Sequence, residues 1–97
     1  MKKRIYIYTA DYCAACPRAK LELMKGARAA GFDMGNIVTY DMENEDAQRM
    51  ATRQKVTGLP TVNLMQGSLI VDSITGNKPE HDAFYYESKI SHWLEGE

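Results

Sequence analysis

The chain has 97 residues, of which 44% are hydrophobic and 26% are charged. This length and this hydrophobic content predict one domain, residues 1–97, whose core is large enough to fold without a cross-link. The 12 basic and 13 acidic side chains leave a net charge of -1. That balance argues against nucleic acid as the main partner, because a phosphate-binding domain usually carries a basic excess.

The first segment, "MKKRIYIYTAD", begins with basic residues and an apolar stretch, as a signal peptide does. The stretch is only about six residues long before Asp11, whereas a signal peptide needs about 7 to 15. No run approaches the roughly 20 apolar residues that span a bilayer. We therefore expect a cytoplasmic protein with no membrane contact. The β-branched and aromatic residues of Arg4–Thr9 predict a strand, covered on both faces as in a parallel sheet.

A helix is expected directly after the two cysteines. Small and apolar residues recur along one face of it, at Cys16, Ala19, Leu23, Ala27 and Ala30. Gly31 follows, and a glycine can adopt the positive φ that often ends a helix. Pro17 removes a backbone donor from the first turn and disfavours helical geometry at Cys16.

The rest of the chain alternates between strand and helix patterns. Ile37–Asp41 reads as a strand, and Asn44 can cap a second helix that carries acidic residues in its first turn. Thr61–Met65 and Leu69–Ile74 predict a β-hairpin around the short turn "QGS". The last helix is expected from Asp82 to Leu94. The predicted order is β-α-β-α-β-β-α.

The chain's two cysteines, Cys13 and Cys16, lie in "YTADYCAACPR". A structural disulfide would close a very short loop and contribute only about 2 kcal/mol, against about 3 for a 15-residue loop. A zinc site needs four ligands, and the other candidates are His81 and His92. We expect both histidines at the surface, about three turns apart on the last helix, so they cannot converge on one ion. No metal site is predicted.

A redox role fits the cysteine pair best. A cysteine at a helix N-terminus meets unpaired N–H groups and the positive end of the helix dipole, and both stabilise a thiolate. Cys13 is then the exposed attacking thiolate, and Cys16, on the apolar face, is the buried resolving thiol. The charge of Asp11 opposes a thiolate, and Arg18 and Lys20 partly offset it.

A second signal lies in "TGLPTV", where Pro60 stands just before the third strand and cannot donate to a ladder. Together with "IYIYTADYCAACPRA" and with Gly76 after the hairpin, this segment resembles the thioredoxin superfamily over nearly the whole chain. The resemblance implies an α/β thioredoxin fold, with a four-stranded mixed central sheet flanked by three helices.

The resemblance also implies a substrate-binding surface. Pro60 would be the cis-proline beside the dithiol, and the backbone of Leu59 would pair with an extended substrate segment. The remaining residues of this surface would be Tyr12, Ala14, Ala15 and Gly76.

Two branches of the superfamily remain open. The short N-terminus and "IYT" are similar to glutaredoxins, whereas "TGLPTV" and the hairpin are closer to thioredoxin. Ala10 stands where glutaredoxins usually carry a lysine, and "TGNKPEHD" differs from their glutathione-binding stretch. Ile7 stands where thioredoxin has a buried aspartate that helps to move protons.

The function implied is a thiol–disulfide oxidoreductase that reduces protein disulfides through Cys13 and Cys16. It would bind no cofactor, and its redox-active disulfide would be restored by a thioredoxin reductase or by glutathione. Its partners would be disulfide-containing proteins, with ribonucleotide reductase as one candidate, and the reductase. The alternatives are a glutathione-dependent glutaredoxin and a thioredoxin-fold binding module that uses no sulfur chemistry.

Overall fold

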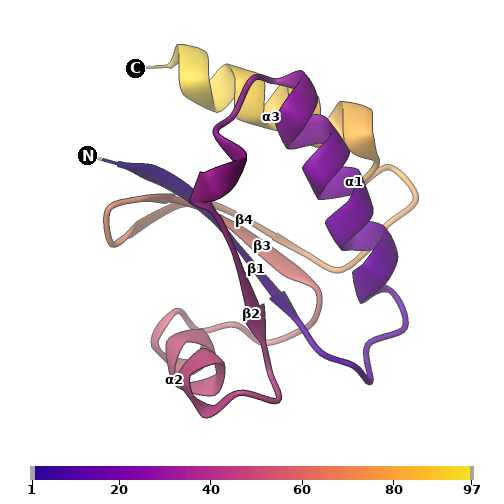
Figure 1. Cartoon of the computed structure of the whole chain (residues 1–97), viewed down its shortest axis with the longest axis vertical. Helices are drawn as coiled ribbons and strands as arrows, with labels where there is room; N and C mark the ends of the chain where they lie inside the picture. The colour runs from indigo at the N-terminus through magenta and orange to yellow at the C-terminus, as the bar shows by residue number, and fades with distance from the viewer. Residues whose placement is uncertain (1, 97) are drawn as a thin grey trace.

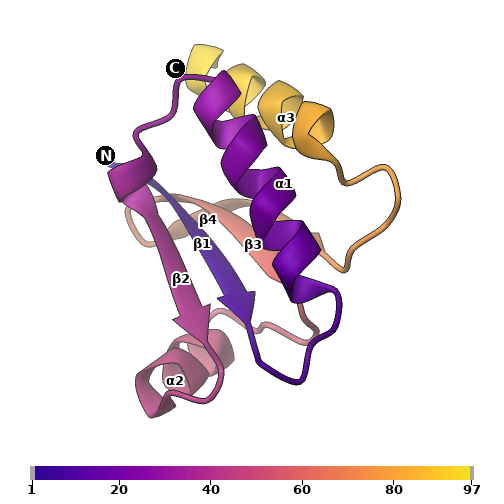
Figure 2. The same cartoon turned by 45° about the vertical axis from the view of Figure 1, so that its right-hand side comes forward.

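The computed structural model describes residues 2–96 and confirms the predicted fold (Figure 1). Four strands form one mixed sheet in the order β2-β1-β3-β4. In Figures 1 and 2, α1 and α3 lie side by side over one face of this sheet, whereas α2 lies apart from them at one end. None of the helices within residues 2–96 is long and apolar enough to cross a membrane. The elements are β1 (Lys3–Thr9), α1 (Cys16–Ala29), the 3-10 helix η1 (Met34–Asn36), β2 (Ile37–Asp41), α2 (Glu45–Arg53), β3 (Thr61–Gln66), β4 (Leu69–Thr75) and α3 (Ala83–Glu95).

The strand register brings three distant chain segments to one end of the sheet. β1 is parallel to β2 and antiparallel to β3, and β4 is antiparallel to β3. Tyr8 pairs with Thr61, and Thr61 pairs with Thr75. The end of β1, the start of β3 and the end of β4 therefore meet, and the cysteine loop leaves the sheet from this end.

The apolar core lies between the sheet and the α1–α3 pair. It is built from alternate strand residues, from one face each of α1 and α3, and from Phe32 in the loop after α1. Its members are Ile5, Ile7, Leu23, Ala27, Phe32, Val62, Leu64, Ile74, Tyr86, Ile90 and Trp93. α1 and α3 approach closely at Gly26, where a Cβ atom would lie 2.5 Å from the carbonyl oxygen of Ala83. Only glycine fits this contact without a backbone shift.

The opposite face of the sheet carries aromatic rings and amides. The rings of Tyr8 and Tyr40 stack with their centroids 5.1 Å apart. The Tyr8 hydroxyl donates to Gln54 Oε1 at 2.7 Å, and Asn63 Nδ2 donates to the same oxygen at 3.0 Å. The hydroxyl of Ser73 donates to Asn63 Oδ1 at 2.6 Å, which completes a polar network at the end of α2.

The local signals read from the sequence appear in the structure. The Asn44 side chain accepts the Asp46 N–H at 2.8 Å and caps α2, and Gly31 has a φ of 78° after α1. α1 begins at Cys16 even though Pro17 follows. Proline is tolerated there because an N–H in the first turn has no intrahelical acceptor to lose. The strands extend one residue beyond the prediction at Lys3, Gln66 and Thr75.

The prediction of a surface position for His81 is wrong. His81 is buried and precedes α3, so it does not lie on the same helix as His92. Its ring lies 4.7 Å from that of Tyr85, and its Nδ1 lies 3.4 Å from both the Lys78 nitrogen and the Gly76 carbonyl oxygen. The segment between β4 and α3 folds back over the ring, a tertiary arrangement that helix periodicity does not reveal.

Candidate redox site

The loop between β1 and α1, visible in Figure 2, carries Cys13, and Cys16 is the first residue of α1. Cys13 and Cys16 form a disulfide, with their Cα atoms 5.5 Å apart. The Cys13 N–H donates to the Ala10 carbonyl at 3.0 Å, and the Cys16 N–H donates to the Cys13 carbonyl at 3.2 Å. These two turns bring the sulfurs together at the start of α1, where the positive end of the helix dipole favours a thiolate.

The two cysteines differ in exposure. Cys16 is only 3% exposed and sits on the packed face of α1, whereas Cys13 is half-buried. An incoming sulfur atom therefore has better access to Cys13 than to Cys16. This asymmetry suits a first attack by Cys13 and a second by Cys16.

Pro60 lies at the same end of the sheet. It is buried, directly precedes β3, and its peptide bond with Leu59 is cis. The Gly76 N–H donates to the Pro60 carbonyl at 2.8 Å, and Gly76 takes a φ of 87°. Gly76 thus ties the end of β4 to the proline, while Leu59 remains half-buried beside it.

The residues between the two cysteines and just before them form the outer surface of the loop. Tyr12 is 78% exposed, Ala14 is exposed and Ala15 is half-buried. The structure therefore gathers the predicted site residues at one end of the sheet, although their part in substrate binding stays a prediction.

Arg18 holds the loop that follows Gly76. Its guanidinium group donates to Asn77 Oδ1 at 2.8 Å and to the carbonyl oxygens of Lys78 and Pro79, both at 3.3 Å. This side chain was expected to offset the charge of Asp11. In the structure, its hydrogen bonds instead join the start of α1 to the β4–α3 loop.

An open hollow of about 380 Å³ lies beside the disulfide. Asp11 and Lys20 are the charged residues that line it, on the loop and on α1. Ile7 is fully buried in the core, so the position of the thioredoxin aspartate is apolar here. The lining residues are Thr9, Ala10, Asp11, Cys13, Cys16, Pro17 and Lys20.

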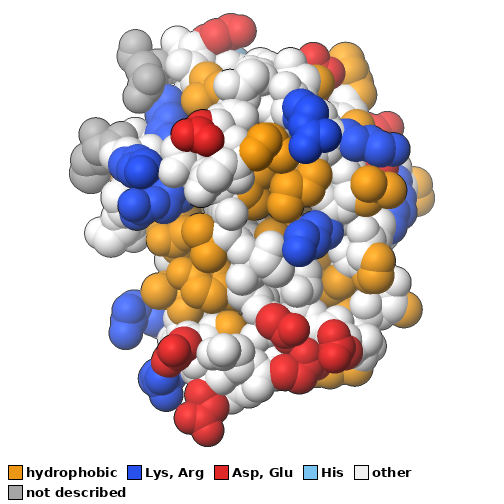
Figure 3. All heavy atoms as spheres, viewed as in Figure 1, with side chains coloured by type: hydrophobic (Ala, Val, Ile, Leu, Met, Phe, Trp, Pro, Cys, Tyr) orange, Lys and Arg blue, Asp and Glu red, His pale blue; other side chains and the backbone are white. Residues whose placement is uncertain are grey.

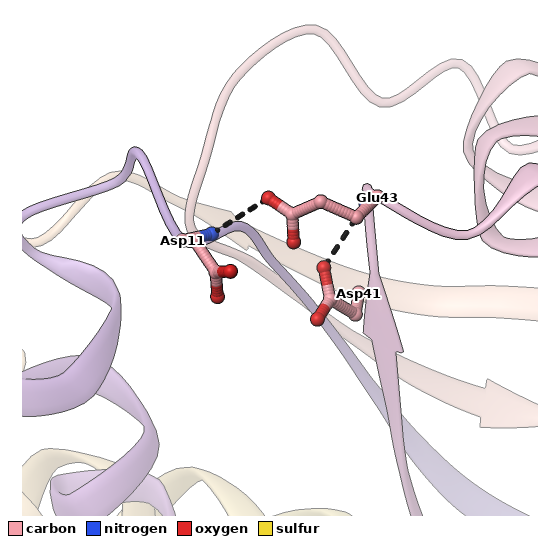
Figure 4. Close-up of side chains that lie close together, drawn as sticks. All are labelled: Asp11, Asp41 and Glu43. Carbon is pink, nitrogen blue, oxygen red and sulfur yellow. Dashed lines mark hydrogen bonds between the residues drawn. The ribbon is translucent and has the colours of Figure 1, made fainter.

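Three exposed carboxylates, Asp11, Asp41 and Glu43, lie together next to the cysteine loop (Figure 4). Glu43 Oε1 accepts the Asp11 N–H at 3.0 Å, and Asp41 Oδ1 accepts the Glu43 N–H at 3.0 Å. A side-chain hydrogen bond between Asp41 and Glu43 raises the pKa of Glu43 and lowers the pKa of Asp41. Each could offer one oxygen to a cation, with these oxygens within 4.8 Å of one another. Exposed acidic groups are common without an ion, so the cluster alone defines no metal site.

No sequence motif indicates that Asp41 and Glu43 lie near the cysteines. The signal that could have found them is the parallel pairing of β1 with β2, which sets Thr9 beside Asp41. Figure 3 shows acidic side chains gathered at the lower end of this face of the molecule. Next to the cysteine loop, the acidic cluster therefore holds two further carboxylates beside Asp11.

Comparison with known proteins identifies the family of this chain. The thioredoxin family model matches residues 2–86. The chain belongs to the thioredoxin family. A comparison with curated protein sequences finds no match.

Solved structures of thioredoxins share the fold at low sequence identity. Thioredoxin-2 of a malaria parasite aligns with a TM-score of 0.68 and 16% identity, over 100% of this chain and 86% of that one. Thioredoxin from Aeropyrum pernix gives 0.68 and 20%, over 98% and 75% of the two chains. Oxidised mitochondrial thioredoxin 3 from Saccharomyces cerevisiae gives 0.67 and 19%, over 98% and 78%. A thioredoxin-family domain with a CxxC disulfide supports thiol–disulfide oxidoreductase activity.

Proposed function

We propose that this protein reduces disulfides in other proteins, with Cys13 as the nucleophile and Cys16 as the resolving thiol. The observation that carries the proposal is the disulfide at the start of α1, in which Cys13 is accessible and Cys16 is 3% exposed. A dithiol of this kind needs one sulfur that reaches the substrate and one that stays back until the second step.

The reaction balances as two thiol–disulfide exchanges. The Cys13 thiolate attacks one sulfur of the substrate disulfide, and the other substrate sulfur leaves as a thiolate. Cys16 loses its proton and attacks Cys13 Sγ, which breaks the mixed disulfide and releases the second substrate thiolate. The substrate gains two electrons, and the protein is left with the Cys13–Cys16 disulfide.

The Leu59–Pro60 segment supports docking of the substrate. It directly precedes β3, at the end of the sheet from which the cysteine loop leaves, and the Pro60 carbonyl accepts the Gly76 N–H. Leu59 therefore lies outside the strand. An extended substrate segment can pair with such a backbone and present its disulfide to Cys13. Tyr12, which is 78% exposed, offers an aromatic surface on the loop itself.

We further propose a cytoplasmic location, since a dithiol reductant needs a reducing compartment. The electron donor is a thioredoxin reductase or glutathione, and the substrates are disulfide-containing proteins, with ribonucleotide reductase as one candidate. No bound cofactor is required, because the two cysteines carry both electrons.

The proposal is tested by equilibrating the protein in a series of glutathione redox buffers and reading its mass after acid quenching. We expect an intramolecular disulfide with a midpoint at low potential and little glutathione adduct. A persistent adduct, above all in Cys16→Ser, would identify a glutathione-dependent glutaredoxin. Thiols that stay reduced across the whole series would overturn the redox function and favour a binding module.

A second measurement follows the reduction of insulin disulfides with dithiothreitol as the electron source. Because the thiolate is the nucleophile, Cys13→Ser should lower the protein-dependent rate by at least about 100-fold. Lys25→Met, on the exposed side of the same helix, is the matched control and should retain the rate. Normal turnover by Cys13→Ser would remove Cys13 from the mechanism.

A further inference from the structure

The second exchange step requires a charged sulfur in a shielded place. Cys16 must be a thiolate to attack the mixed disulfide, yet it is only 3% exposed, and burial disfavours a charge. Ile7, at the position where thioredoxin has a buried aspartate, is fully buried and carries no ionisable group. Another group has to favour the Cys16 thiolate if this step is to proceed at neutral pH.

We propose that Lys20 is the residue that stabilises the Cys16 thiolate, with its ammonium group placed over the sulfur from the next turn of α1. This inference rests on the proposed function and assigns a residue to its second step. Lys20 acts through Cys16 and is therefore a positioning residue for disulfide closure.

Helix geometry directs Lys20 toward Cys16. The two residues are four apart in α1 (Cys16–Ala29), and side chains four apart are neighbours on a helix surface. Helical side chains also lean toward the N-terminus, so Lys20 extends back over the turn that holds Cys16. Both residues line the same open hollow beside the disulfide, which places the lysine and the sulfur beside one solvent-accessible space.

The Lys20 ammonium group is available for this role. Within residues 2–96, it has no hydrogen bond or ion pair with another side chain or backbone group. Arg18 is held by the β4–α3 loop, and Lys25 lies 3.8 Å from Glu22. Lys20 is also half-buried and lines the hollow, an environment in which a lysine stem packs on apolar surface while its charged end stays in water.

The other charges around the hollow oppose a thiolate. Asp11 lines it from the cysteine loop, and the carboxylates of Asp41 and Glu43 lie close to that of Asp11. These carboxylates make an unassisted thiolate less favourable. Lys20 is the cation that lines the same space, and in the oxidised protein its neighbours there include two neutral sulfurs. Reduction turns one sulfur into a thiolate and gives Lys20 a partner.

The chemistry conserves atoms and electrons. The Cys16 thiol releases its proton to water in the hollow, and its thiolate pairs with the Lys20 ammonium group. The thiolate then attacks Cys13 Sγ, the Cys13–substrate bond breaks, and the substrate sulfur leaves with the electron pair. Lys20 keeps its own proton throughout, so no further reactant is needed.

The first test measures the ionisation of Cys16 in a Cys13→Ser background, from the ultraviolet absorbance of the thiolate as the pH is raised. A cation close to a sulfur in a partly wet site shifts its midpoint by about 0.5 to 1 unit. Lys20→Met should raise the midpoint by that amount, and Lys20→Arg should restore most of it. Lys25→Met removes the same charge away from the hollow and should leave the midpoint unchanged.

The second test follows disulfide closure in the protein with both cysteines. The reduced protein is mixed with an aromatic disulfide that releases a coloured thiolate, first on attack by Cys13 and then on attack by Cys16. Lys20→Met should slow the second release by about threefold to tenfold at pH 7, as expected from that change in thiolate fraction. The first release should change less.

These tests separate two kinds of failure. A second release whose rate and pH profile are the same in Lys20→Met as in the unaltered protein would overturn the role of Lys20 and leave the reductase function standing. Absence of any second release from the unaltered protein would overturn the two-step function itself. An equal effect of Lys25→Met would show a general charge effect and would also overturn the role of Lys20.

Discussion

The two faces of the sheet are built on different physical principles. The face under α1 and α3 is apolar, and side chains such as those of Ile5, Leu23 and Val62 pack together there in the core. The face toward α2 holds stacked tyrosine rings and the hydrogen-bond network of Gln54 and Asn63. The first face is stabilised by close packing of apolar side chains, and the second by hydrogen bonds between buried polar groups. Substitutions should therefore lower stability by opening cavities on the first face and by removing hydrogen bonds on the second.

The largest expected effect is on the apolar face. Leu23 is a fully buried core residue of α1, and truncation of its side chain would leave a cavity that its neighbours cannot fill. Leu23→Ala should lower the free energy of unfolding by about 2 to 5 kcal/mol. Urea denaturation followed by circular dichroism measures this change.

Leu21 provides the matched control on the same helix. Its side chain is 53% exposed, so Leu21→Ala removes the same atoms with little loss of buried surface. We expect a change within about 0.5 kcal/mol. Equal losses from the two variants would contradict the placement of the core on the Leu23 side of α1.

How far the sequence predicts this molecule follows the same division. The apolar face was predictable because Cys16, Ala19, Leu23 and Ala27 repeat at helical spacing, and the structure buries these four. Ala30, the fifth predicted member, is the half-buried C-cap residue of α1. The cysteine motif and "TGLPTV" were also predictable, because each can be identified from its own residues. Local periodicity and short motifs suffice where one element decides the outcome.

The rest depends on contacts between distant segments. Asp11 meets Glu43 only because β1 pairs with β2 in parallel, and no local pattern sets that register. His81 is buried because the β4–α3 loop folds over it, while Arg18 from α1 holds that loop. Net charge near the sulfurs was therefore harder to predict than the positions of the sulfurs.

An intermediate effect is expected on the α2 face. The Tyr8 hydroxyl is buried and donates to Gln54 Oε1 at 2.7 Å. Tyr8→Phe removes this bond, but Asn63 still donates to the same oxygen, so the acceptor keeps a partner. The free energy of unfolding should fall by about 1 kcal/mol.

The matched control for Tyr8→Phe is Tyr12→Phe, since Tyr12 is 78% exposed. It deletes a hydroxyl that water can solvate in both the folded and the unfolded state. We expect no measurable change in stability. If Tyr8→Phe were also neutral, the polar network would not stabilise the α2 face.

The smallest expected effect has the opposite sign and lies on the apolar face. Tyr86 is 1% exposed, and within residues 2–96 its hydroxyl has no hydrogen-bond partner. A buried hydroxyl without a partner costs free energy, and phenylalanine of the same shape removes that cost. Tyr86→Phe should therefore raise the free energy of unfolding by up to about 1 kcal/mol.

The pH dependence of stability provides an independent check on Tyr86. Burial raises the pKa of Tyr86 from 10.0 to about 12, so the folded state holds the phenol proton more tightly than the unfolded state does. The stability linked to this proton is fully present below pH 10 and is lost as the pH rises toward 12. Tyr86→Phe lacks this loss, so its advantage should grow over that range in urea titrations at successive pH values. An advantage that stays constant with pH would mean that the hydroxyl is solvated in the folded state, and it would contradict the burial of this phenol without a partner in the apolar face.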